Sequence, residues 1–110
     1  MEKFTVGNVV LVIFPFSNLK GKKVRPALVL ARVEFNNLIL CQITSKPYSS
    51  KTAIGITKTD FAKGSLPVKS YVRPDKIFTA DPAIIKGKAG NLKSSKKRMI
   101  LKKVRELFAE

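Results

Sequence analysis

Arg25 and Thr44 are the two side chains in this sequence best suited to chemistry on a phosphate group. Arg25 stands directly before Pro26 and the apolar run 27–31, and Thr44 closes a second apolar run that begins at Leu38. A planar guanidinium binds a phosphate through two parallel N–H bonds, and a hydroxyl can donate a third. With RNA, such a pair would stabilise the phosphorane that forms when a neighbouring 2′-hydroxyl attacks. The plainer alternative is that Arg25 forms a salt bridge at a strand edge and that Thr44 simply suits a β-strand.

Short β-strands must position this pair. The apolar runs and their turn signals predict strands over 6–14, 26–33, 38–44, 53–57, 70–73, 76–79 and 85–92, with Pro15 and Pro74 ending two of them. The last residues show helical spacing of Met99, Ile100, Val104, Leu107 and Phe108, so we expect an amphipathic helix of about fifteen residues that begins at Ser94 or Ser95. This order predicts a mainly β fold with helices (α+β), a small, strongly bent barrel with a C-terminal helix packed on it.

A hairpin between the second and third strands is expected to bring Arg25 and the segment 43–45 to one rim. Glu34 to Asn37 supplies the turn, in which asparagines tolerate positive φ. A turn centred on Asn36 and Asn37 would place Arg25 opposite positions 46 to 48. A register slip of one residue would send the side chains to the other face.

The charge of the chain indicates a polyanionic partner. Its 110 residues include 22 Lys and Arg against seven Asp and Glu, a net charge of +15. Such an excess is typical of a protein that binds nucleic acid, and less often of one that binds an acidic protein. The alternative is that the lysines are merely solvated. The candidate RNA-binding residues lie in the polar loops beside Arg25 and Thr44, where Phe16 and Tyr48 could stack on a base: Phe16, Lys20, Lys22, Lys23, Ser45, Lys46, Tyr48 and Lys51.

Composition also limits the class of protein. The length fits a single domain over residues 1–110, and no apolar run is long enough to span a bilayer. A single cysteine, Cys41, and the lack of a signal-peptide pattern favour a cytoplasmic protein. With no histidine, a metal site is hard to build, so we expect neither a metal nor a cofactor. Cys41 is expected in the core, and Asp75 and Asp81 in an ion pair with a nearby lysine or in a cap rather than as general bases.

Several segments together resemble the MazF/PemK toxins. They are Val6 to Val10, Phe14-Pro15-Phe16, Arg25 to Leu30, Ile43-Thr44-Ser45 and Ser70 to Thr79, and the resemblance extends from about residue 5 to residue 108. It implies an SH3-like barrel and a homodimeric endoribonuclease, the toxin of a type II toxin–antitoxin pair. Such toxins cut single-stranded RNA without metal and leave a 2′,3′-cyclic phosphate and a 5′-hydroxyl. Arg25 corresponds to the family's active arginine and Thr44 to its active threonine or serine.

The resemblance also implies a partner, an antitoxin with an acidic C-terminal segment that lies across the RNA groove. Two departures from the family pattern bear on activity. Asn8 stands where the family usually has Asp, and the loop before Arg25 reads Gly21-Lys22-Lys23, where some members carry an acid. Asn can replace an Asp that only orders the turn by accepting backbone hydrogen bonds, whereas replacing an Asp that tunes the active site electrostatically would lower activity. The alternatives are a barrel that binds nucleic acid without cutting it and a gyrase-binding toxin similar to the CcdB-like proteins, which act through a C-terminal tryptophan that this chain lacks.

Overall fold

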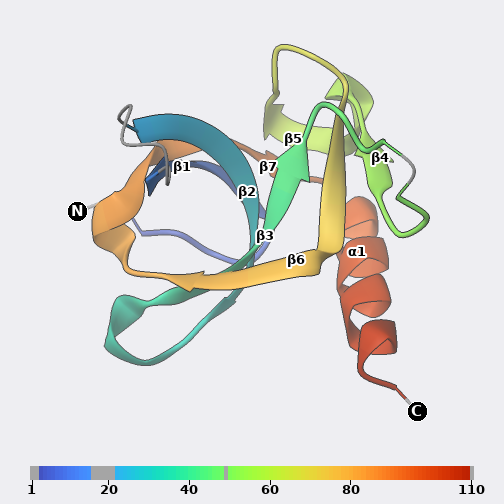
Figure 1. Ribbon diagram of the computed structural model, residues 1–110. Helices are drawn as coiled ribbons and strands as arrows, with labels where there is room; N and C mark the ends of the chain where they lie inside the picture. The colour runs from blue at the N-terminus through green and yellow to red at the C-terminus, as the bar shows by residue number, and fades with distance from the viewer. Residues whose placement is uncertain (1–2, 16–21, 49, 110) are drawn as a thin grey trace.

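The computed structural model describes residues 3–15, 22–48 and 50–109, and in these ranges it is built from strands with one α-helix at the C-terminal end (Figure 1). The elements are β1 (Asn8–Pro15), β2 (Lys22–Arg32), β3 (Leu38–Thr44), β4 (Ile54–Ile56), β5 (Phe61–Gly64), β6 (Ser70–Ala80), β7 (Ile85–Leu92) and α1 (Ser94–Leu107). Short 3₁₀ helices cover Glu34–Asn36, Lys58–Asp60 and Pro82–Ile84. None of the helices in the described ranges has the length and apolar character of a membrane span.

The strands form one strongly curled antiparallel sheet in the order β4-β6-β3-β2-β1-β7-β5. Figure 1 shows this sheet closing into a half-barrel, with α1 beside β6. The predicted fold class, a small bent barrel with a C-terminal amphipathic helix, is confirmed. The curl places the start of β2 and the end of β3 at one rim, where the candidate residues lie.

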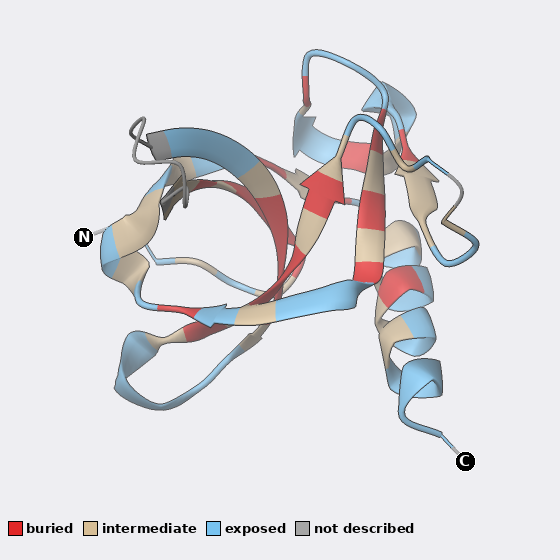
Figure 2. Ribbon diagram, viewed as in Figure 1, coloured by how far each residue is buried: buried red, intermediate tan, exposed pale blue. Residues whose placement is uncertain are grey.

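Successive residues of β2 are buried on opposite faces of the sheet, which explains its unbroken apolar run. Leu28 and Leu30 belong to one core cluster, whereas Ala27 and Val29 belong to the other. In Figure 2 the buried residues follow the middle of the curled sheet. The cluster that contains Leu28 and Leu30 also contains Ile100 of α1, which is fully buried and fixes the helix to the sheet.

Two prolines lie inside strands, whereas the sequence predicted that Pro26 begins a strand and that Pro74 ends one. Pro26 lies inside β2, opposite Leu11 of β1, and the ladder to β3 begins only one residue later, at Ala27. Pro74 is buried within β6, where one residue of β3 faces the four residues 73–76. A proline fits there because residues of a bulge are not paired in the ladder and need no N–H donor.

The remaining differences lie at turns and caps. Residues 61–64 form β5, a strand that is absent from those predicted from the sequence. Gly64 makes this strand possible, because it has a φ of 72° and a side chain there would collide with the Ala89 carbonyl oxygen of β7. In the hairpin, Phe35 and Asn36 take the positive φ values, while Asn37 is extended. The residue before α1 is Lys93, which gives no side-chain cap.

Candidate functional site

The rim where β2 begins and β3 ends borders a groove of about 650 Å³. Arg25 and Thr44 both line it, as the sequence predicted from the hairpin. Its walls come from four parts of the chain, namely β1, the start of β2, the end of β3 with the loop after it, and the segment before β6. The lining residues are Leu11, Lys23, Arg25, Pro26, Ile43, Thr44, Ser45, Lys46, Tyr48, Leu66, Pro67, Val68 and Ser70.

The register of the hairpin puts Arg25 closer to Thr44 than the sequence predicted. The last pair of the ladder is Ala27 with Gln42, and this register, continued two residues further, leads from Arg25 to Thr44 and not to positions 46 to 48. The predicted register was wrong because the turn is centred one residue earlier and a bulge between Val29 and Ala31 shifts the pairing. Arg25 and Thr44 lie beyond the paired residues, and both line the groove at this rim.

The Thr44 hydroxyl shapes the loop that follows β3. It accepts a hydrogen bond from the Lys46 amide at 3.1 Å and donates to the Lys46 carbonyl oxygen at 3.3 Å. Hydroxyls make such local turns where a strand ends. The donated bond is long, so the hydroxyl proton can turn to a phosphate oxygen while the amide of Lys46 stays in place. Thr44 therefore can both order the groove wall and contact a ligand.

Cations and one aromatic ring surround this pair. Lys23 and Lys46 line the groove with Arg25, and Ser45 lies beside them. Tyr48 has a φ of 53° and is 86% exposed, so its ring is open to stacking on a base. These residues give the groove the chemistry of a polyanion site.

Not every predicted contact residue lies in this groove. Lys51 lines a different pocket, between the loop and α1. Phe16 and Lys20 fall outside the described residues, as does the side chain of Lys22. Sequence reasoning missed the wall formed by Leu66 to Ser70, because no local pattern indicated which side of the barrel that turn would cover.

The acidic side chains of Asp60, Asp75 and Asp81 accept hydrogen bonds outside the groove. None of the carboxylates in the described ranges lines the groove. Asp81 accepts from the Ala83 amide at 2.8 Å, and Asp60 caps its 3₁₀ turn by accepting from the Thr57 amide at 2.9 Å. Asp75 receives two hydrogen bonds from Arg73, which hold the pKa of its carboxyl below the usual range. Asp81 therefore forms a cap and Asp75 an ion pair, as expected, but the partner of Asp75 is Arg73 and not the predicted lysine.

Two further residues have structural roles. Cys41 is fully buried in β3, and this burial raises the pKa of its thiol to about 12, so it is a core residue and not a nucleophile. Asn8, which is 5% exposed, accepts a hydrogen bond from the Thr5 amide through Oδ1 at 2.8 Å. Its carbonyl oxygen thus orders the turn before β1, the role in which Asn can stand for Asp.

Comparison with known proteins assigns the chain to a family. A family model described as "PemK-like, MazF-like toxin of type II toxin-antitoxin system" matches residues 5–108. The chain belongs to this toxin family. Comparison with curated protein sequences gave no significant match.

Solved structures of other family members share the fold. One is MazE-MazF (Form-II) from Deinococcus radiodurans, with a TM-score of 0.77 at 16% identity over 98% of this chain and 97% of that one. The Mycobacterium tuberculosis toxin MazF-mt6 gives 0.69 at 19% identity, over 92% and 95% of the two chains. An endoribonuclease in complex with its cognate antitoxin, from a mycobacterial species, gives 0.64 at 16% identity, over 99% and 92%.

Proposed function

We propose that this toxin is a sequence-specific, metal-independent endoribonuclease that cleaves single-stranded RNA in the groove between Arg25 and Thr44. The observation that carries the proposal is that both side chains line one groove, at the rim where the ladder between β2 and β3 ends. Family membership and the net charge of +15 support it independently. As a metal-free hydrolase acting on mRNA, it would work in the cytoplasm without a cofactor.

The chemistry is an internal transfer of the phosphoryl group. The RNA 2′-oxygen forms a bond to the neighbouring phosphorus and the bond from phosphorus to the 5′-oxygen breaks, which gives a 2′,3′-cyclic phosphate and a 5′-hydroxyl. Negative charge grows on the two non-bridging oxygens in the transition state. The Arg25 guanidinium binds these oxygens, and Thr44 donates to one of them and fixes the phosphate.

Proton transfer must proceed without a carboxylate from the described part of the groove. Neither the 16–21 segment nor the Gly21-Lys22-Lys23 sequence contains Asp or Glu. We therefore assign the 2′-hydroxyl proton to water, and protonation of the leaving 5′-oxygen to Arg25 or a water that it orients. Catalysis then depends mainly on electrostatic stabilisation of the phosphorane by Arg25.

The partners follow from the same groove. A cognate antitoxin with an acidic C-terminal segment would neutralise the cations around Arg25 and exclude RNA, and its complex with the toxin would bind DNA. The relatives from Deinococcus radiodurans and from a mycobacterial species were solved as complexes with antitoxins, which supports this partner. We also propose that the active species is a homodimer, as the family resemblance implies.

The test is cleavage of a long single-stranded RNA in EDTA by the wild type, Arg25→Ala and Arg25→Lys. Arg32→Ala is the matched control, because it removes the same charge from the same strand, seven residues or about 23 Å along β2 from Arg25. We expect discrete cuts with cyclic-phosphate ends from the wild type and Arg32→Ala. Arg25→Ala should cut at least a hundredfold more slowly, and Arg25→Lys should be impaired because an ammonium lacks the planar fork.

The second candidate is a barrel that binds nucleic acid without cutting it. It is favoured by the absence of a described carboxylate from the groove and by the engagement of the Thr44 hydroxyl in its own turn. Binding to single strands would then weaken with salt at a slope of about −0.7 per phosphate contact, with intact RNA at every protein concentration.

A further inference from the structure

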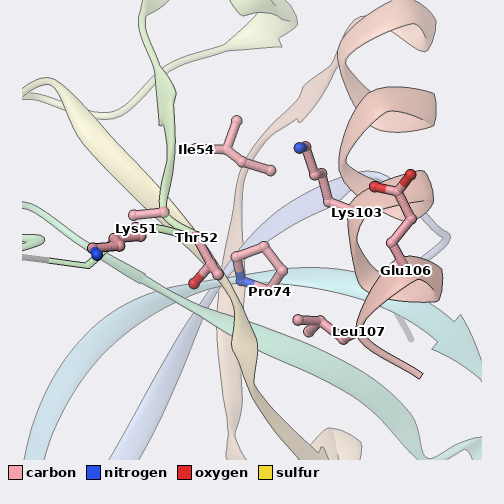
Figure 3. A pocket seen from close by; sticks show the side chains of 8 residues that line it. Lys51, Thr52, Ile54, Pro74, Lys103, Glu106 and Leu107 are labelled. Carbon is pink, nitrogen blue, oxygen red and sulfur yellow. The ribbon is translucent and has the colours of Figure 1, made fainter. Parts of the chain in front are cut away.

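The loop between β3 and β4 separates two hollows. On one side its residues Ser45, Lys46 and Tyr48 line the candidate groove. On the other side Lys51 and Thr52 line a pocket of about 310 Å³ against α1, which Figure 3 shows together with Pro74 of β6 and Leu107 of the helix. The position of this loop therefore sets the shape of one groove wall.

An ion pair on β6 holds the far end of the loop. Arg73 donates to Asp75 from Nε at 3.1 Å and from Nη2 at 2.9 Å. Thr52 donates to the same carboxylate, from Oγ1 to Oδ1 at 3.3 Å. Both carboxylate oxygens of Asp75 thus accept from the protein, and the residue lies outside the groove.

This contact ties the loop to a rigid element. Asp75 follows the buried Pro74 in the bulge of β6, where the proline ring fixes the backbone. The loop's other hydrogen bonds between described residues are local, from Thr44 to Lys46, from Ser50 to Pro47 and between Ser50 and Thr52. Both ends of the loop are held to β6, since Thr44 pairs with Tyr71 and Ile54 with Val72, and the bond from Thr52 to Asp75 ties the stretch between these ends to the same strand.

We infer that Asp75 is a positioning residue that, through Thr52, sets the loop carrying Lys46 and Tyr48 and thereby the affinity and site selection of the groove for RNA. This inference rests on the proposed function of the groove. It assigns Asp75 no proton transfer, since its carboxylate already accepts from Arg73 and Thr52.

Thr52→Val tests the inference because it removes the hydroxyl and keeps the shape of the side chain. Loss of one hydrogen bond of ordinary strength predicts a rise of about three- to tenfold in KM for a short single-stranded RNA, an altered distribution of cuts on a long RNA, and an unchanged kcat. Thr52→Ser should restore both the KM and the cuts. Thr57→Val is the matched control, since Thr57 also pairs with an aspartate, Asp60, on a turn outside the groove.

Amide hydrogen exchange without RNA separates this inference from the proposed function. Thr52→Val should speed exchange in the loop after β3, and Thr57→Val should not. Unchanged exchange and unchanged KM in Thr52→Val would overturn the inference even if the wild type cuts RNA. Loss of kcat in Asp75→Asn with a silent Thr52→Val would also overturn it, because Asp75 would then act on the substrate directly. A wild type that neither cuts nor binds RNA would overturn the proposed function. Faster exchange in the loop of Thr52→Val would still establish that the bond from Thr52 to Asp75 holds the loop in place.

Discussion

Replacing Asn8 by the aspartate that is usual in the family tests whether the side chain at this position only orders the turn before β1 or also acts on Arg25 through its charge. Asn8 Oδ1 accepts from the Thr5 amide, and a carboxylate oxygen can accept the same bond. Asn8 stands four residues along β1 from Val12, the residue paired with Arg25, a separation of about 13 Å along the strand. Asn8→Asp therefore adds a negative charge to the turn without disturbing the contacts of the groove.

The effect of this charge on Arg25 is modest. At an effective dielectric constant of about 20, unit charges about 13 Å apart interact by about 1.3 kcal/mol, and salt screens this interaction little because Asn8 is 5% exposed. Asn8→Asp should therefore change kcat/KM for RNA by less than about tenfold. Asn8→Ala, which leaves the Thr5 amide without its acceptor, should lower the free energy of unfolding by about 1–3 kcal/mol.

The assay for both variants is urea unfolding, followed by cleavage of single-stranded RNA under conditions where each variant is folded. The turn-ordering role predicts a destabilised Asn8→Ala whose folded fraction cuts normally. A hundredfold or larger change in kcat/KM for Asn8→Asp at full stability would refute the reasoning, because a single charge about 13 Å from Arg25 cannot produce it.

Four further predictions concern Cys41, α1 and β5. At pH 8 iodoacetamide should modify Cys41 about a thousandfold more slowly in the folded than in the urea-unfolded protein, since the rise in pKa from 9.0 to about 12 lowers the thiolate fraction by that factor. Between pH 9 and about pH 12 the unfolded chain loses the thiol proton of Cys41, whereas the folded chain keeps it. The free energy of unfolding should therefore fall as the pH rises above 9, as measured by urea titrations. Ile100→Ala should reduce the free energy of unfolding by about 2–5 kcal/mol, and a loss below 1 kcal/mol would contradict the buried contact of α1. Gly64→Ala should destabilise the fold through its positive φ and the Ala89 carbonyl, whereas Gly87→Ala, with open space around it, should be nearly neutral in the same measurement.

Much of the fold could be predicted because the pattern is local. The apolar run from Leu38 to Thr44 predicted β3 with its observed bounds, and the run from Ile85 to Leu92 predicted β7. The short β5 and the continuation of β6 through Pro74 were not predicted. Both depend on partners far along the chain, since a bulge can hold a proline only when the neighbouring strand leaves those residues unpaired.

The candidate site was predictable in its centre and not at its edges. The rim formed by Arg25 and Thr44 follows from any hairpin that joins the two strands, but the register of that hairpin depends on a bulge that no local pattern indicated. The wall from Leu66 to Ser70 and the position of Lys51, in the pocket beside α1 and not in the groove, are set by the closure of the whole barrel. Local signals thus identified that Arg25 and Thr44 lie at one rim, but not which loops surround them.

The most direct test of the central claim is the rate at which purified wild type and Arg25→Ala cut single-stranded RNA in EDTA, with the fragment ends identified. The proposed function predicts discrete wild-type cuts that carry 2′,3′-cyclic phosphates and a loss of at least a hundredfold in the variant, with Arg32→Ala unaffected. Equal cleavage by wild type and a folded Arg25→Ala would contradict the account. Intact RNA at excess wild-type protein would contradict it as well and would leave the groove as a binding surface.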